Sequence, residues 1–129
     1  MPFLIDTNIA IHIRDGNDAV IRRFLSHKGS VLLSALSLAE LQSGLFQKTD
    51  LTPLRQMRLE EMLRGMPVIA FDETAALAYG RIVAQLGWAR ARDFDRLIAA
   101  HAIATASILV TNNIADFRDI PGLQLEDWT

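Results

Sequence analysis

Short apolar runs recur along the chain, and each ends at a polar residue or a turn. Runs of this length with few charged positions are typical of strands buried on both faces. One such run is the first segment, which ends at Asp6. The predicted strands cover 2–5, 31–34, 67–71 and 108–111, and 123–126 fits a short fifth strand at an edge.

Between the apolar runs, hydrophobic positions recur at helical spacing. Leu38, Leu41 and Leu45, for example, would share one face of a helix. Residues that cap helix starts and glycines that end helices mark the boundaries. The predicted helices cover 7–14, 17–27, 37–48, 52–64, 72–86 and 93–106.

The alternation of strands with helices indicates the fold class and the domain count. It predicts an α/β sandwich around a mainly parallel central sheet. No linker, repeat or low-complexity segment divides the sequence, so we interpret residues 1–129 as a single domain. In such sheets, sites form outside the carboxyl ends of the strands. The polar residues that follow strands are therefore the ones to consider for chemistry.

Composition excludes several classes of protein. The sequence has no cysteine, which removes disulfides, thiolate metal sites and cysteine nucleophiles. No apolar run reaches the roughly 18 residues of a membrane span, and the start lacks the pattern of a signal peptide. We therefore expect a cytoplasmic protein. The net charge of −2 is not typical of a general nucleic-acid binder, although a local basic patch would still allow binding.

Acidic and amide residues follow or approach the predicted strand ends. Carboxylates brought to one rim repel one another unless a cation neutralises them, and oxygen-rich clusters suit Mg²⁺ or Mn²⁺. Such an ion can orient a phosphodiester and activate an attacking water. The residues in question are Asp6, Glu40, Asp93, Asp95, Asn112, Asn113 and Asp116.

Each of these residues also has a purely structural interpretation. Asp6 and Asp93 fit N-caps, and Ser37 with Glu40 fits a capping box. Asp95 would complement a helix dipole, and Asp116 would be a solvated loop acid. Spacing alone leaves these alternatives open. His101 lies among small residues and is better interpreted as a core histidine than as a ligand of a hard cation. We find neither a serine hydrolase triad nor a glycine-rich phosphate loop.

Motifs along nearly the whole sequence resemble one family. LIDTNI at 4–9, SLAEL at 37–41, DFDRLIAAHAIA at 93–104 and LVTNNIADFRDIPGLQLEDW at 109–128 resemble the VapC toxins, which are PIN-domain ribonucleases of toxin–antitoxin modules. The resemblance implies a three-layer α/β/α fold. It also implies cleavage of single-stranded or loop RNA, often tRNA, with Mg²⁺ or Mn²⁺. By motif position, Asp6, Glu40 and Asp95 would hold the metal.

The sequence departs from the family pattern in places. The usual fourth acid, in a T-x-D pattern, is replaced by Asn113, for which Asp116 would compensate. This departure leaves open whether one ion or two are held. Many relatives carry Gly-Pro before the third acid, where this chain has ARARDFD. There Asp93 is a cap or an outer acid. We expect Thr7 and Asn8 to position a metal-bound water. Three arginines surround the third acid: Arg90, Arg92 and Arg96. They either bind RNA phosphates or form a solvated run of charges.

The resemblance also implies partners. A VapB-type antitoxin would cover the acidic site, and the toxin would be a homodimer that forms a higher assembly with antitoxin. The predicted helices 37–48 and 52–64 are rich in leucine and methionine, which suits either core packing or a groove for an antitoxin helix. Two rival functions remain. One is a non-catalytic RNA- or protein-binding module. The other is an aspartate-nucleophile phosphohydrolase, which Asn8 disfavours because these enzymes usually carry a second aspartate there.

Overall fold

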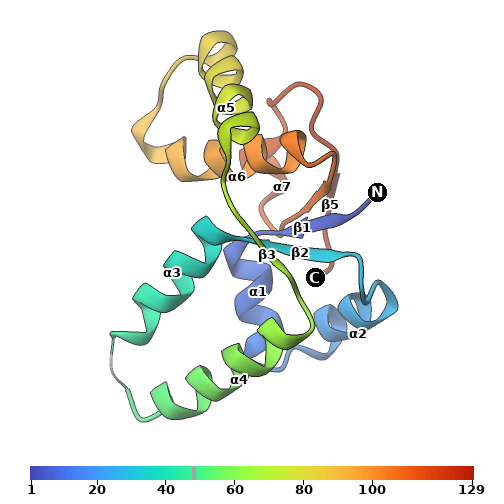
Figure 1. Cartoon of the computed structure of the whole chain (residues 1–129), viewed down its shortest axis with the longest axis vertical. Helices are drawn as coiled ribbons and strands as arrows, with labels where there is room; N and C mark the ends of the chain where they lie inside the picture. Colours follow the sequence, from blue (N-terminus) through green and yellow to red (C-terminus); the bar gives the residue numbers. More distant parts are fainter. Residues whose placement is uncertain (48) are drawn as a thin grey trace.

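The computed structural model describes residues 1–47 and 49–129. Its centre is a sheet of parallel strands in the order β3-β2-β1-β4-β5 (Figure 1). In this part of the chain, no helix is long and apolar enough to cross a membrane. The strands are β1 (Phe3–Ile5), β2 (Val31–Ser34), β3 (Val68–Ile69), β4 (Ile108–Val110) and β5 (Leu125–Glu126).

Helices cover both faces of the sheet, which confirms the predicted three-layer α/β/α sandwich (Figure 1). One layer contains α1 (Thr7–Arg14), α2 (Asp18–Ser26), α3 (Ala35–Leu45) and α4 (Thr52–Arg64). The other contains α5 (Glu73–Leu86), the 3-10 turn η1 (Arg90–Arg92), α6 (Asp93–Ala104) and α7 (Ile114–Phe117).

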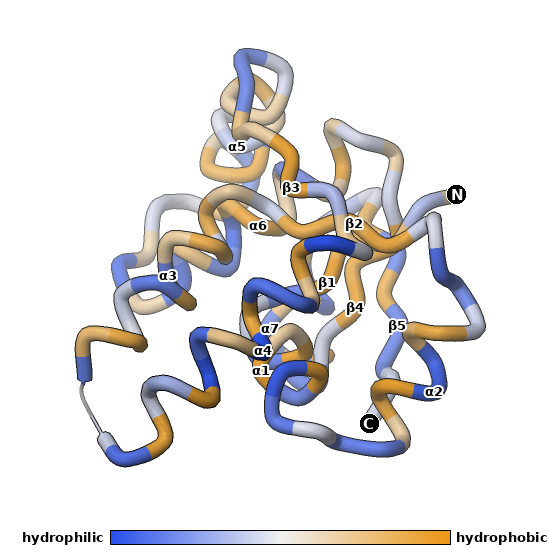
Figure 2. The backbone as a smooth tube through the Cα atoms, turned by 60° about the horizontal axis from the view of Figure 1, so that its bottom comes forward, coloured by the Kyte–Doolittle hydropathy of each residue, from blue (hydrophilic) through white to orange (hydrophobic). Residues whose placement is uncertain are grey.

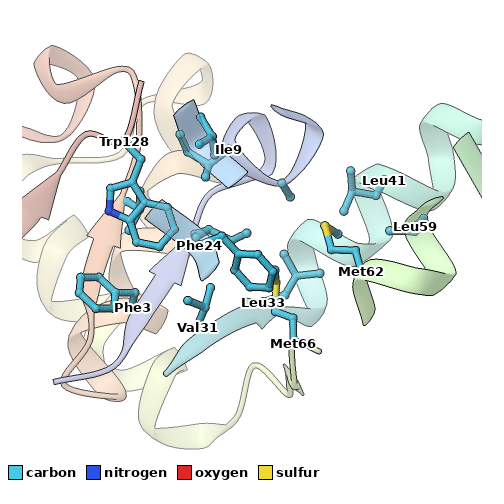
Figure 3. Packing of buried hydrophobic residues seen from close by; sticks show 14 residues of the cluster. Phe3, Ile9, Phe24, Val31, Leu33, Leu41, Leu59, Met62, Met66 and Trp128 are labelled. Carbon is cyan, nitrogen blue, oxygen red and sulfur yellow. The ribbon is translucent and has the colours of Figure 1, made fainter. Parts of the chain in front are cut away.

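The pleat of β1 divides the apolar side chains between two cores. Phe3 and Ile5 belong to the cluster shared with α1, α2 and α4, whereas Leu4 belongs to the cluster under α5 and α6. Figure 3 shows the first cluster closing over the sheet, with Trp128 beside Phe3. Each fully buried large side chain of this kind contributes roughly 1.5–3 kcal/mol relative to exposure. Figure 2 shows the central strands as mainly hydrophobic, as strands covered on both faces should be.

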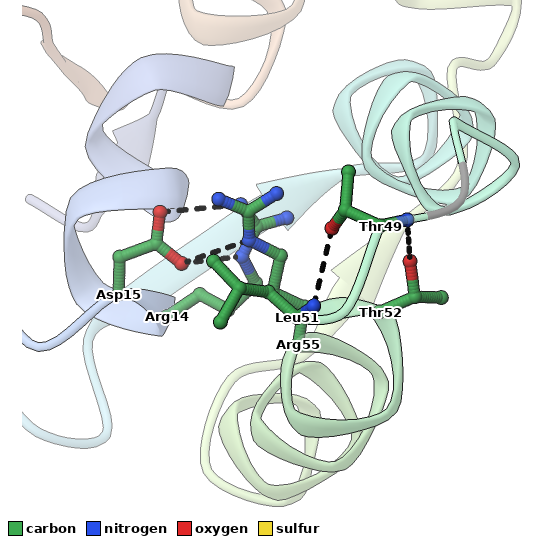
Figure 4. Close-up of polar contacts among 6 residues, drawn as sticks. All are labelled: Arg14, Asp15, Thr49, Leu51, Thr52 and Arg55. Atoms are coloured by element: carbon green, nitrogen blue, oxygen red, sulfur yellow. Dashed lines mark hydrogen bonds and ion pairs between the residues drawn. The ribbon is translucent and has the colours of Figure 1, made fainter.

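An ion pair joins α4 to the end of α1, and local hydrogen bonds shape the start of α4. The guanidinium groups of Arg14 and Arg55 both approach Asp15 Oδ1, at 3.0 and 3.9 Å (Figure 4). In the segment before α4, the Thr49 hydroxyl accepts from the Leu51 amide at 3.2 Å, and the Thr52 hydroxyl accepts from the Thr49 amide at 2.9 Å. These bonds hold the start of a helix whose N-cap Leu51 has no side-chain cap.

Several boundaries differ from the sequence prediction. The structure shortens β3 to Val68–Ile69 because only β2 pairs with it, through two residue pairs. The helix predicted to start at 37 begins at Ala35, and its predicted end at Lys48 lies outside the described residues. Its cap is Ser34, whose hydroxyl accepts from the Leu36 amide at 3.1 Å. The capping box of Ser37 with Glu40 is therefore wrong.

The parallel sheet brings the ends of its inner strands to one rim. Ile5 pairs with Leu33 on one side and with Val110 on the other. Because these strands run in the same direction, the residues that follow them emerge together at the carboxyl edge. Asp6 and Thr111 are therefore delivered to the same edge.

Candidate active site

A cavity of about 290 Å³ opens at this edge, between α1, α3, α6 and the segment after β4. It brings together several of the site residues that the sequence predicted, on walls that are partly apolar. The lining residues are Asp6, Thr7, Asn8, Ile11, Glu40, Phe94, Asp95, Ile98, Asn113 and Phe117.

Asp6 is buried directly after β1, where it caps a helix and also lines the cavity. Its Oδ1 accepts a hydrogen bond from the Ile9 amide at 3.0 Å, so it caps α1. It also lines the cavity. Burial raises the pKa of the Asp6 carboxyl, and the nearby charge of Glu40 adds to the rise, whereas hydrogen bonds from Thr111 and the Ile9 amide oppose it.

Glu40 is oriented toward the cavity by a neighbouring helix. The Thr7 hydroxyl donates to Glu40 Oε1 at 2.5 Å, which joins the start of α1 to the middle of α3. The carboxylate is therefore engaged by Thr7 instead of the start of its own helix. Thr7 is thus a residue that positions an acid, where the sequence suggested only that it positions a water.

Asp95 lies in the first turn of α6 and experiences the charge of the other acids. Burial raises the pKa of its carboxyl most, followed by the charges of Asp116, Asp6 and Glu40, while Arg92 opposes the rise. Asp116 does not line the cavity, but its effect on Asp95 shows that its carboxylate lies within electrostatic range. Asp6, Glu40, Asp95 and Asp116 are therefore close enough for their charges to affect one another.

The lining supplies donors that suit a hard divalent cation. Asp6, Glu40 and Asp95 offer carboxylate oxygens, and Asn8 and Asn113 offer amide oxygens. Within residues 1–47 and 49–129, no group of three or more Asp, Glu, His or Cys side chains already has a spacing that could hold a metal ion. The chemistry of the donors in the cavity fits Mg²⁺ or Mn²⁺.

Asp93 and the predicted arginines take separate positions. Asp93 is the first residue of α6 and not its cap, because η1 places Arg92 at the cap position. Its carboxylate accepts from the Tyr79 hydroxyl. Arg90 is exposed, and Arg92 donates to the Asp116 carbonyl at 3.1 Å.

Arg96 is buried and donates to the Gly87 carbonyl. The sequence could not distinguish it from Arg90 and Arg92. A buried guanidinium that already binds a backbone carbonyl is poorly placed to grip RNA phosphates. We therefore correct the expectation for Arg96 and assign it a structural role.

Other residues of the site were missed from the sequence. Thr111 is fully buried and binds Asp6, although its place after β4 at the carboxyl edge was a usable signal. The apolar walls Phe94, Ile98 and Phe117 could not be assigned, because only the packing of α6 against α7 turns them toward the cavity. His101 is buried as expected, and its Nδ1 lies 2.9 Å from Ser34 Oγ.

Known proteins resemble this chain along nearly its whole length. Residues 3–123 match the PIN domain family. The chain is 33% identical over 132 residues to the tRNA(fMet)-specific endonuclease VapC of Shigella flexneri, covering 100% of this chain and 99% of that protein. It is 34% identical over 134 residues to Ribonuclease VapC2 of Rickettsia felis, covering 99% and 98%.

Solved structures show the same architecture. VapBC2 from Rickettsia felis, bound to a promoter DNA fragment, contains a chain with a TM-score of 0.88 and 31% identity, and each chain covers 100% of the other. DNA-bound VapBC from Salmonella typhimurium contains one with a TM-score of 0.87 and 28% identity, covering 100% of this chain and 99% of that one.

Proposed function

The chain belongs to the PIN-domain family and, within it, to the VapC ribonucleases, and we propose that its acidic cavity is where RNA phosphodiester bonds are hydrolysed. The protein is an endoribonuclease of the toxin–antitoxin type. The observation that supports the site is that Asp6, Glu40 and Asp95 line one cavity at the carboxyl edge of the sheet.

Nucleases of this family generally depend on divalent metal ions, and we propose Mg²⁺ or Mn²⁺ here. The cation supplies activation of the attacking water and charge neutralisation at the phosphoryl group. Asp6, Glu40 and Asp95 would hold it, with Asn113 as a neutral donor that adds no charge. Asp116 tunes Asp95 through its charge, and Asn8 and Thr7 orient the groups around them. The apolar walls Phe94 and Phe117 limit access of bulk water to the cavity.

Removing single carboxylates tests this assignment. Asp6→Asn and Asp95→Asn should each lower the rate of RNA cleavage with Mg²⁺ or Mn²⁺ by at least about 100-fold, the loss seen when one group that stabilises a transition state is removed. Asp18→Asn is the matched control, because Asp18 is an exposed acid on α2. Cleavage at the wild-type rate by both cavity variants would refute the site.

A VapB-type antitoxin is the partner that the VapBC relatives support. We propose that it contacts the exposed apolar residues where α3 ends and α4 begins. The structure separates the leucine- and methionine-rich helices into core residues such as Leu41 and Leu59, which are buried, and an exposed set. That exposed set is Phe46, Leu51, Leu54 and Met57. Phe46→Ser with Met57→Ser should weaken co-purification with a VapB-type antitoxin while RNA cleavage persists.

The substrate and the assembly are also proposals. We propose tRNA as the substrate, because the relative from Shigella flexneri is named for tRNA(fMet). Mapping of new 5′ ends after brief expression, with Asp6→Asn as the control, identifies the RNA and the cut site. We further propose a homodimer, and sedimentation of the purified chain tests it directly.

A further inference from the structure

Trp88 is a large aromatic residue that the core does not use. Its exposed fraction is 63%, whereas that of the second tryptophan, Trp128, is 2%. It lies between α5 and η1, directly after Gly87, whose φ of +77° ends α5. Glycine adopts this conformation without strain, so the chain turns sharply and presents Trp88 beyond the helix.

Hydrogen bonds of neighbouring residues fix the chain on both sides of Trp88. On one side, the buried Arg96 donates to the carbonyl of Gly87. On the other, the Tyr79 hydroxyl donates to the Asp93 carboxylate, and the Trp88 side chain is close enough to this hydroxyl to lower its pKa slightly, against the larger rise that Asp93 causes. Most of the Trp88 side chain nevertheless stays open to solvent.

The charge around Trp88 differs from that of the chain as a whole. The segment 87–92 has the sequence GWARAR, with two arginines and no acid, in a chain of net charge −2. Arg90 is exposed, and Arg92 donates to the carbonyl of Asp116 at 3.1 Å. Asp93 begins the helix that carries Asp95 into the cavity. The aromatic and basic segment therefore leads directly into the helix whose first turn contributes Phe94 and Asp95 to the acidic cavity.

An exposed aromatic ring followed in the sequence by arginines has the chemistry of a site for single-stranded nucleic acid. Bases stack on aromatic faces whatever their identity, while arginines contact the phosphates. We infer that Trp88 stacks against an unpaired base of the RNA substrate while Arg90 contacts its backbone, so that the neighbouring phosphodiester is held over the acidic cavity. This inference rests on the proposed nuclease function and names a further substrate contact for it.

A protein contact is the alternative, and the surroundings of Trp88 disfavour it. Its sequence neighbours are Gly87, Ala89 and Arg90, which do not form a continuous apolar patch. Approach of an RNA phosphate to a cleft lined by carboxylates is electrostatically unfavourable. Arginines at the rim offset that repulsion for RNA, but they add little to an apolar protein interface.

Fluorescence titration with a short single-stranded RNA oligonucleotide tests the inference. In an Asp95→Asn background without metal, which prevents cleavage, RNA should quench the emission of Trp88. Trp88→Ala should weaken binding about 5- to 150-fold, the range for loss of one stacked base. Trp88→Phe should retain much of the affinity, because its ring still stacks. Duplex RNA of the same sequence should bind with little dependence on Trp88.

Tyr79→Phe tests whether the hydrogen bond between Tyr79 and Asp93 helps to position the neighbouring Trp88. It removes the hydroxyl that donates to Asp93 close to Trp88, and it keeps the ring that packs against the core of α5 and α6. We expect lower steady-state anisotropy of Trp88 emission and weaker RNA binding, with unfolding unchanged within about 1 kcal/mol, as for most single neutral hydrogen bonds.

The outcomes separate the inference from the nuclease proposal. Equal RNA affinity of the Trp88→Ala and parent proteins, without quenching, would overturn the inference alone if the wild-type chain cleaves RNA. A change in oligomeric state or in antitoxin binding, without a change in RNA affinity, would make Trp88 a protein contact and also overturn it. If the wild-type chain does not cleave RNA, the nuclease proposal fails, while the titration still reports on Trp88. Absence of any RNA binding would overturn both.

Discussion

Asp6 shows how one side chain can serve both the fold and the site. One carboxylate oxygen accepts from the Ile9 amide and so completes the first turn of α1. A carboxylate has several lone pairs, so the cap leaves others directed to the cavity. The rigid cap also fixes where the carboxylate lies. Replacing Asp6 by Asn keeps a capping oxygen and removes the charge, which makes this variant a cleaner test of function than alanine.

The crowding of acids should make the site a source of instability. Asp95→Asn removes a half-buried carboxylate that Asp116, Asp6 and Glu40 repel. We expect the metal-free variant to be more stable than wild type by about 0.5–1 kcal/mol, the scale of interactions between partly solvated charges. Thermal unfolding in EDTA measures this difference. A lower stability than wild type would contradict the electrostatic interpretation, and Asp18→Asn should show no comparable gain.

The burial of His101 should make the stability of the fold depend on pH. Burial lowers the pKa of His101, although a hydrogen bond with the Ala70 backbone and the charge of Asp72 oppose the shift. The unfolded chain therefore takes up this proton first as the pH falls below about 6.5. Stability should decrease with falling pH, by at most about 1.4 kcal/mol per pH unit, until the folded histidine is also protonated.

Denaturant titrations between pH 7 and pH 5 measure this slope. His101→Gln is the comparison, because glutamine keeps polar atoms near Ser34 and cannot titrate. We expect the variant to be less stable overall but to lose the part of the slope that comes from His101. An identical slope in both proteins would mean that other groups cause the pH dependence.

At the scale of helices and strands, the sequence predicts those features that depend on residues close together in the chain. The caps Asp6, Asn17 and Asp72 each accept from a backbone amide in the first turn of the helix that follows. The capping box at Glu40 failed because the competing partner, Thr7, is distant in sequence and reaches Glu40 only when α1 packs against α3. The burial of Arg96 was missed for the same reason, since it depends on where Gly87 turns.

The turn between α6 and β4 contains one residue with a strained backbone conformation. Ala106 has a φ of +51°, in the left-handed region that disfavours residues with a Cβ. Ala106→Gly relieves this strain but makes the unfolded chain more flexible, so we expect a net gain of about 0.5 kcal/mol. Ala84→Gly, in the exposed interior of α5, is the matched control and should cost about 1 kcal/mol. Denaturant unfolding of both variants should therefore give changes of opposite sign.

At the scale of the whole molecule, the end of the chain closes the first core. Trp128 packs against Phe3 and stacks on His27, with ring centroids 5.4 and 5.7 Å apart. Its indole donates to Glu126 at 2.9 Å, and Arg23 of α2 also binds Glu126. The C-terminal segment therefore links the edge strand β5 to α2 and β1. These contacts involve none of the acids that line the cavity.

The two tryptophans should consequently separate stability from RNA binding. Trp128→Ala removes a buried ring from the first core and should cost about 3–5 kcal/mol of unfolding free energy. Trp88→Ala removes an exposed ring and should leave unfolding nearly unchanged, within about 0.5 kcal/mol. Under conditions where both variants are folded, RNA titration should show the reverse order, with affinity lost only in Trp88→Ala. If Trp128→Ala also lost RNA affinity while folded, the first core would have to influence the rim of the cavity, and the division of roles between the two rings would be wrong.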